Sequence, residues 1–71
     1  MNKLILIIDE CTSIPRFALE PQEEHTRKEL KEIGTQWVRQ YLKDNGYNHN
    51  PFYFIVTTQN QVKKSVQRIK I

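Results

Sequence analysis

The stretch Leu4-Ile5-Leu6-Ile7-Ile8 decides the fold of this chain. An unbroken apolar run without alternation is typical of a strand that is covered on both faces. Asp9 and Glu10 end the run, which is too short for the core of a signal peptide and far too short to span a bilayer. We therefore predict a buried strand at residues 3–9, in a cytoplasmic protein without a membrane segment.

A second strand is predicted at residues 52–58, which read Phe-Tyr-Phe-Ile-Val-Thr-Thr. Aromatic and β-branched residues are enriched in strands because they fit a pleated, half-buried surface. Pro51 precedes this stretch, at a point where the missing N–H of proline does not interrupt the ladder.

A long amphipathic helix is predicted at residues 21–44, between these two strands. Pro21 suits a first helical position, and Gly46 is a natural terminator just past the end. Gly34 lies inside the apolar stripe, which predicts a close approach of the helix to the sheet or to another helix. The stripe repeats at spacings typical of a helix and consists of Leu30, Ile33, Trp37, Val38, Tyr41 and Leu42.

The two remaining segments carry weaker signals. Residues 10–20 contain Pro15 and are interpreted as a long connection, whose apolar side chains pack back onto the core. In residues 60–71, Val62, Val66 and Ile69 share one helical face, which favours a helix. The alternation at the very end of the chain leaves a third strand as the alternative.

These elements predict one small α/β domain spanning residues 1–71. Its architecture is a β-α-β unit, with the helix packed on a two- or three-stranded sheet and a parallel, right-handed crossover. The alternative with a C-terminal strand is β-α-β-β. Since two strands are too few for independent stability, we expect the sheet to be completed by the tail, by a homodimer or by a partner that adds to its edge.

Composition narrows the function classes. The chain has 71 residues, 38% apolar and 27% charged, which is ordinary for a single folded domain. Cys11 is the lone cysteine, which excludes an intramolecular disulfide and a cysteine metal cluster and fits a reducing compartment. His25 and His49 have no third ligand at a diagnostic spacing, so we predict no metal site and no cofactor.

One stretch has the form of a catalytic motif. Leu4 to Glu10 resembles the Walker B strand of nucleotide triphosphatases, in which an aspartate holds magnesium and a glutamate orients water. The resemblance covers seven residues, and the sequence contains no Gly-rich phosphate-binding loop. A minimal magnesium-dependent hydrolase or nuclease therefore ranks last, and we predict no catalytic residues and no enzyme.

The favoured function is a non-enzymatic interaction module that binds a larger protein, as an inhibitor or modulator. The small size and the Lys/Asn/Ile bias resemble those of compact proteins from phages and other mobile elements. Aromatic and arginine side chains are the usual anchors of protein interfaces, so the candidate contacts are Trp37, Arg39 and Tyr41.

The alternative is a small basic protein that binds RNA or another nucleic acid. The net charge is +3, and residues 60–71 hold cations but no acid. Cationic side chains follow a phosphate backbone and aromatic side chains stack on bases. The candidate residues are Lys63, Lys64, Arg68 and Lys70.

Overall fold

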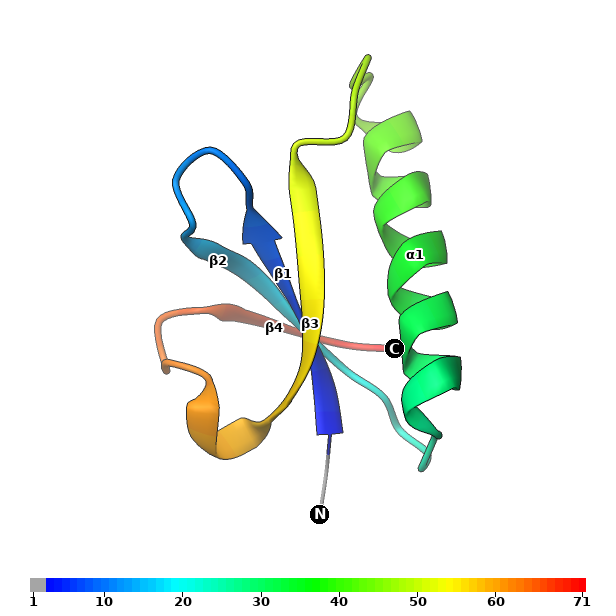
Figure 1. Cartoon of the computed structure of the whole chain (residues 1–71), viewed down its shortest axis with the longest axis vertical. Helices are drawn as coiled ribbons and strands as arrows, with labels where there is room; N and C mark the ends of the chain where they lie inside the picture. Colours follow the sequence, from blue (N-terminus) through cyan, green and yellow to red (C-terminus); the bar gives the residue numbers. More distant parts are fainter. Residues whose placement is uncertain (1–2) are drawn as a thin grey trace.

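The computed structural model describes residues 3–71 and shows a helix packed on one face of a mixed sheet (Figure 1). The strands are β1 (Lys3–Asp9), β2 (Pro15–Glu20), β3 (Phe52–Thr58) and β4 (Gln67–Lys70), the long helix is α1 (Arg27–Asp44), and a short 3-10 helix, η1 (Gln59–Gln61), follows β3. The predicted α/β class, with one long helix on a sheet, is confirmed, as are the strands at 3–9 and 52–58.

The order of strands in the sheet is β3-β1-β2-β4. β1 lies between β2 and β3 and is antiparallel to both, whereas β4 is parallel to β2. The prediction that the first strand is parallel to the strand after the helix is wrong, because β2 reverses the chain before α1 begins. The β-α-β crossover exists, but it joins β2 to β3 and passes over β1.

β1 is covered on both faces, as its unbroken apolar run predicts. Ile5 and Ile7 belong to the larger core cluster, which lies beneath α1. The alternate residues of β1 form a second cluster on the other face, together with Ala18 and with Val62 and Val66 from the segment between β3 and β4. Neither face of this central strand is left open.

Residues 10–20 form a hairpin turn and a strand rather than the predicted long connection. Asp9 organises the turn, because one of its carboxylate oxygens accepts from the backbone N–H groups of Cys11 and Thr12. Pro15 is the first residue of β2, beside a register shift, where its missing N–H is tolerated. Ile14 stays 57% exposed, so only part of the apolar content of this segment packs onto the core.

α1 begins at Arg27 rather than at Pro21, because Thr26 and Glu29 form a capping box. The Thr26 hydroxyl accepts from the Glu29 N–H at 3.1 Å, and the Glu29 carboxylate accepts from the Thr26 N–H at 2.8 Å. The end of the helix agrees with the prediction, since Asp44 is its last residue and Gly46 has a positive φ of 69°.

Gly34 confirms the predicted close approach of helix and sheet. A Cβ at this position would lie 3.0 Å from Phe54 of β3 and 3.2 Å from Ile5 of β1. Glycine therefore lets α1 settle directly onto the two strands that it covers.

The favoured helix at residues 60–71 is wrong, and the alternative of a C-terminal strand is confirmed. η1 makes a short turn, residues 62–66 cross the sheet face opposite α1, and β4 then pairs with β2. With β2 and β4 present, residues 3–71 form four strands, so the tail completes the sheet, as one of the three expected alternatives has it. Both faces of β1 are covered.

Candidate functional site

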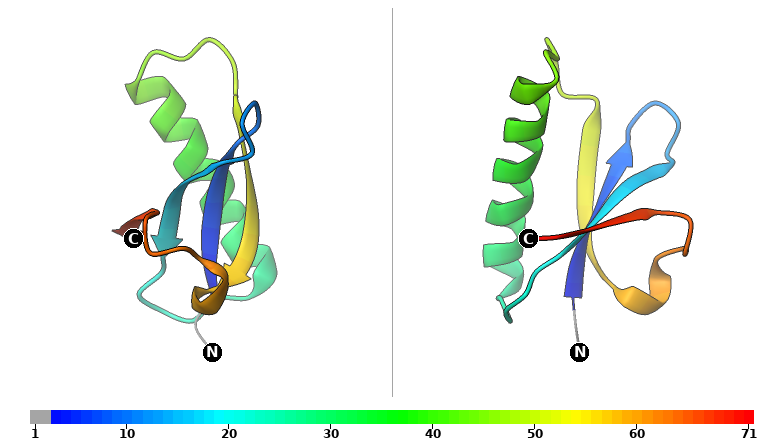
Figure 2. Two further views of the ribbon diagram at one scale, coloured as in Figure 1. Left: turned by 90° about the vertical axis from the view of Figure 1, so that its left-hand side faces the viewer. Right: turned by 180° about the vertical axis from the view of Figure 1, so that it is seen from behind.

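β3 forms one border of the sheet, and its outer side is open. Figure 2 (left) shows the strand at the rim, next to β1, and within residues 3–71 no other strand pairs with it on the far side. β3 is seven residues long and contains neither lysine nor proline. A long apolar edge of this kind is a template for pairing with another chain.

The register shows which backbone groups of β3 point outward. Glu10 donates its N–H to the Pro51 carbonyl at 2.8 Å, so these two residues form a hydrogen-bonded pair. Such pairs alternate with non-bonded pairs along an antiparallel ladder. The residues of β3 that bond β1 are therefore Tyr53, Ile55 and Thr57, whereas Phe54 and Val56 direct their N–H and C=O groups away from β1.

Two other hydrogen bonds support this assignment. The Phe52 N–H, which the same alternation directs outward, donates to the Asn50 side chain at 2.9 Å. On the opposite side of β1, the Asp9 N–H points toward β2 and donates to the Ile14 carbonyl. The Asn50 side chain thus satisfies the first outward N–H of β3. The outward N–H groups of Phe54 and Val56 are left for acceptors outside the sheet.

The side chains of β3 add apolar surface to this edge. Tyr53 and Ile55 project on the face away from α1 and are 42% and 45% exposed. Phe54 and Val56 project toward α1 and are half-buried against the core. A strand laid beside β3 would cover apolar side chains on both faces.

The opposite border of the sheet is protected. β4 has four residues, and both Arg68 and Lys70 lie on it. Short length and cationic side chains are two means by which natural edge strands resist pairing. The two edges of the sheet therefore differ, and β3 is the one suited to accept a strand.

A line of hollows, which we call the β3 groove, runs between α1 and the open edge. The largest has a volume of about 470 Å³ and lies between Arg39 and Leu42 of α1 and Phe52 and Phe54 of β3. The next one shares Phe54 with it and continues past Arg27, Lys31 and Val56, and a third lies beyond it, at the Thr58 end of the strand. The groove thus follows the full length of β3.

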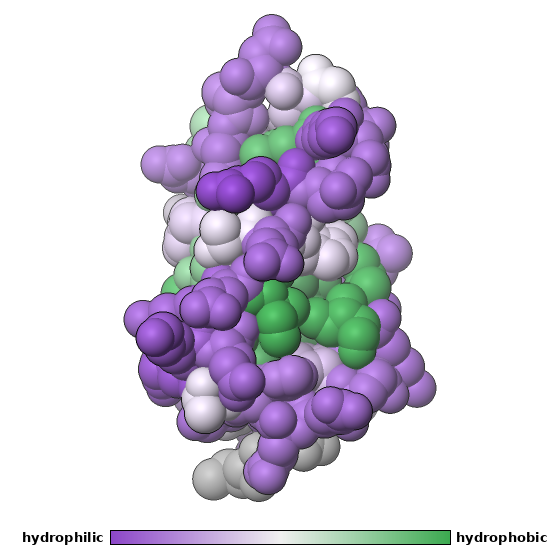
Figure 3. All heavy atoms as spheres, turned by 90° about the vertical axis from the view of Figure 1, so that its right-hand side faces the viewer, coloured by the Kyte–Doolittle hydropathy of each residue, from purple (hydrophilic) through white to green (hydrophobic). Residues whose placement is uncertain are grey.

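The structure separates the three predicted interface residues. Trp37 and Tyr41 stack on each other with ring centroids 5.3 Å apart, and Phe17 of β2 packs against both rings. Arg39 lies at the other flank of the helix, where it lines the β3 groove. Their role in binding stays a prediction. The side of the molecule on which α1 lies is mostly hydrophilic, with a few hydrophobic residues visible between the hydrophilic ones (Figure 3).

None of the predicted nucleic-acid residues lines this groove. Lys63 and Lys64 are exposed on the segment between η1 and β4, and Arg68 and Lys70 lie on β4. Arg68 forms an ion pair with Glu20 of β2, with the nitrogen 3.5 Å from the carboxylate oxygen. The role of these cations also stays a prediction.

Asp9, the aspartate of the Walker B resemblance, has a structural role in the β1–β2 turn. One carboxylate oxygen accepts backbone N–H groups of the turn, and the other lies 3.7 Å from the Arg16 guanidinium. In the part of the chain that the structure describes, no group of three or more His, Cys, Asp or Glu side chains is placed to hold a metal ion.

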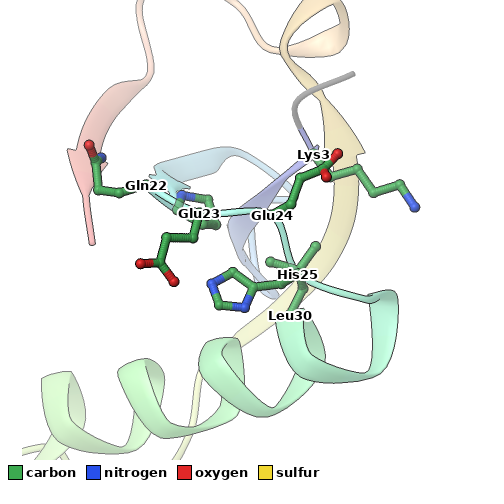
Figure 4. Close-up of a pocket in the computed structure, with 7 residues that line it drawn as sticks. Lys3, Gln22, Glu23, Glu24, His25 and Leu30 are labelled. Atoms are coloured by element: carbon green, nitrogen blue, oxygen red, sulfur yellow. The ribbon is translucent and has the colours of Figure 1, made fainter.

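A further hollow of about 270 Å³ lies where the segment before α1 passes the start of β1 (Figure 4). Its lining is polar, and the side chains of Gln22 and Lys3 point to opposite sides of it. Because these two side chains diverge, they do not bind one ligand together.

Glu29 lies outside this lining, and its hydrogen bonds to the backbone N–H and side chain of Thr26 lower the pKa of its carboxyl.

The comparisons add no relative: no family model, no curated protein and no solved structure matches the chain. Among residues 3–71, no helix combines the length and the apolar character that crossing a membrane requires.

Sequence reasoning missed the residues of α1 that line the β3 groove together with Arg39. Arg27 and Lys31 stand four residues apart, and Arg39 follows eight residues later. Multiples of four residues place side chains along one side of a helix, and this spacing is visible in the sequence. What the sequence does not show is that these turns border an open strand.

Proposed function

We propose that this protein is a non-enzymatic protein-binding module, and that β3 accepts an extended segment of the partner as an added strand. The observation that carries the proposal is the open edge, where the N–H and C=O groups of Phe54 and Val56 point outward. Strand addition supplies main-chain hydrogen bonds for affinity, and side-chain pockets along the edge supply specificity.

Two features of the site support this proposal. The β3 groove offers pockets beside the edge, as strand-adding modules require for alternate side chains of the added strand. Tyr53 and Ile55 supply exposed apolar surface on the other face of the same strand. Burial of such surface contributes roughly 25 cal/mol per Å², which adds to the hydrogen bonds of the backbone.

The test uses peptides of about ten residues, selected from a random display library on the purified protein. Selected peptides are expected to shift the backbone amide resonances of Phe54 and Val56. Val56→Pro removes one outward N–H without removing a bond to β1, and we expect it to weaken binding about tenfold or more. Val56→Ala is the matched control, because it truncates the same side chain but keeps the N–H.

A second variant protects this test against misfolding of the proline variant. Ile55→Lys leaves the backbone intact and places a cation on the exposed face of the edge. Natural edge strands resist pairing in this way, so this variant is also expected to weaken binding. Equal binding by Val56→Pro and Val56→Ala, or selected peptides that shift only the resonances of Trp37 and Tyr41, would refute strand addition at β3.

Within this proposal, the protein acts as an inhibitor or modulator of the phage or mobile-element type. When a segment of the partner adds to β3 as a strand, that segment is no longer free for its other contacts. We further propose that it acts in a reducing cytoplasm, since its lone cysteine, Cys11, is exposed at the β1–β2 turn.

Binding of RNA or another nucleic acid is the second candidate function. It is favoured by the cations on the segment that leads into and forms β4. Changing Lys63, Lys64, Arg68 and Lys70 to Gln is expected to weaken binding of a labelled single-stranded RNA, measured by anisotropy, and to reduce its dependence on salt. Binding that is independent of salt, or absent at low salt, would count against this function.

A further inference from the structure

The β3 groove is cationic along its whole length. Arg27, Lys31 and Arg39 of α1 line it, and Lys3 lies at its far end. Among the residues described as lining its three hollows there is no aspartate and no glutamate. Where residues 3–71 form ion pairs, these join Arg16 to Asp9 and Arg68 to Glu20, so the cations of the groove are not neutralised in this way.

We propose that the segment that β3 accepts is an acidic, extended peptide of another protein, with carboxylates at alternate positions facing α1. This inference rests on the proposed function, since it assumes that a strand adds to β3. The acidic character of that strand follows from the charges that it would meet.

The spacing of the cations matches that of a strand. α1 and β3 run side by side along the length of the molecule (Figures 1 and 2). Residues four apart on a helix rise by about 6 Å, which separates Arg27 from Lys31 along the helix axis. Alternate residues of a strand, which share one face, are about 6.8 Å apart. Two successive carboxylates on the α1 side of an added strand would therefore meet Arg27 and Lys31. Arg39 lies eight residues after Lys31, about 12 Å along the axis, so it would meet the second carboxylate after that pair, and the one between would lie near Thr35.

The backbone of the edge favours a peptide over a nucleic acid. Phe54 and Val56 each present an N–H donor and a C=O acceptor outward. Phosphate oxygens accept hydrogen bonds but do not donate them, whereas a peptide backbone offers both groups at the spacing of a ladder. An acidic peptide thus satisfies the carbonyls of β3 and the cations of α1 together.

The charges also disfavour a second copy of this chain as the occupant. If β3 paired with β3 of another copy about a twofold axis, the two α1 helices would lie next to each other on the same face of the joined sheet. Arg27, Lys31 and Arg39 would then face the same cations of the second copy. Like charges brought together at an interface oppose association. Acidic side chains in the same place would instead attract the cations of α1.

The experiment compares three labelled eight-residue peptides by fluorescence anisotropy. The first alternates Glu with Val and Thr, and the other two carry Gln or Lys in place of every Glu. We expect the Glu peptide to bind about tenfold more tightly than the Gln peptide, to lose affinity as salt rises and to shift the amide resonances of Phe54 and Val56. The Lys peptide is expected not to bind.

A charge reversal on α1 provides the matched test. The double variant Arg27→Glu, Lys31→Glu is expected to lose the preference for the Glu peptide and to favour the Lys peptide. Lys63→Glu, Lys64→Glu changes the net charge by the same amount on a different segment, so it should retain the preference of the original protein.

The outcomes separate this inference from the function on which it rests. Equal binding of all three peptides at Phe54 and Val56 would overturn the acidic preference but leave strand addition standing. Failure of every peptide to shift these resonances would overturn both. A dimer in sedimentation equilibrium that Val56→Pro converts to a monomer would show that a second copy occupies the edge, and would overturn the acidic partner.

Discussion

The start of α1 is set by the side chains of Thr26 and Glu29, each of which accepts a hydrogen bond from the backbone N–H of the other. Thr26 followed three residues later by Glu29 is a capping-box pattern, and it outweighs the suitability of Pro21 for a first helical position. The place of Gly34 in the apolar stripe likewise predicts the close approach of helix and sheet that the structure has. Single positions with a strong local chemistry are therefore well predicted when the pattern is recognised.

Thr26→Ala is expected to lower the free energy of unfolding by about 1 kcal/mol, because it leaves the Glu29 N–H without its cap. Urea denaturation followed by circular dichroism measures the change. Thr58→Ala is the control, since Thr58 precedes η1 but makes no side-chain cap hydrogen bond. Equal effects of the two substitutions would show that the cap contributes nothing.

The lowered pKa of Glu29 predicts a pH dependence of stability. Because the folded pKa lies below the unfolded one, the stabilisation is complete above the ordinary glutamate pKa and is lost as the pH falls through the lowered value. Glu29→Gln retains the cap but does not titrate. The urea midpoints of the two proteins should therefore differ less at about pH 3 than at about pH 7. A constant difference would contradict the capping role of the carboxylate.

Gly34→Ala places two physical effects in opposition. Alanine improves helix propensity by about 1 kcal/mol, but its Cβ would press on Phe54 and Ile5, and overpacking costs about 1–3 kcal/mol. We expect a net loss of about 1 kcal/mol in urea denaturation. Gln36→Ala, at an exposed position of α1, is the control with little change expected. A stabilised Gly34→Ala protein would refute the close approach of helix and sheet.

At the scale of elements, the strong signals of the sequence predict β1, β3 and most of α1. They indicate a connection where β2 forms and favour a helix where β4 forms. β2 begins with a proline and follows a turn without glycine, and β4 has four residues. Strands of this kind form because a neighbouring strand pairs with them, so their existence depends on tertiary contacts that local patterns do not contain. The prediction that β1 and β3 are parallel is wrong for the same reason.

The segment between β3 and β4 covers one sheet face with two valines. Val66→Ala is expected to lower the free energy of unfolding by about 1–2 kcal/mol, because it uncovers Leu4, Leu6 and Ile8 in part. Urea denaturation measures the loss. Ser65→Ala, at an exposed neighbouring position, should have almost no effect. If Val66→Ala also left the free energy of unfolding almost unchanged, this segment would not be part of the core.

At the scale of the whole molecule, the expectation of a partner stays a prediction, and the observation behind it changes. The sequence indicates too few strands, whereas residues 3–71 form a four-stranded sheet in which both faces of β1 are covered. What remains open is one long edge, bordered by a cationic groove. The sequence shows the residues of that edge but not that they lie at the border of the sheet, since strand order is a property of the assembled fold.

Amide hydrogen exchange, measured residue by residue with and without the Glu peptide, tests the open edge most directly. In the free protein, the amides of Phe54 and Val56 should exchange at least about tenfold faster than those of Tyr53 and Ile55, and the peptide should slow them selectively. Slow exchange at Phe54 and Val56 in the free protein, or no slowing when the peptide is bound, would contradict the account.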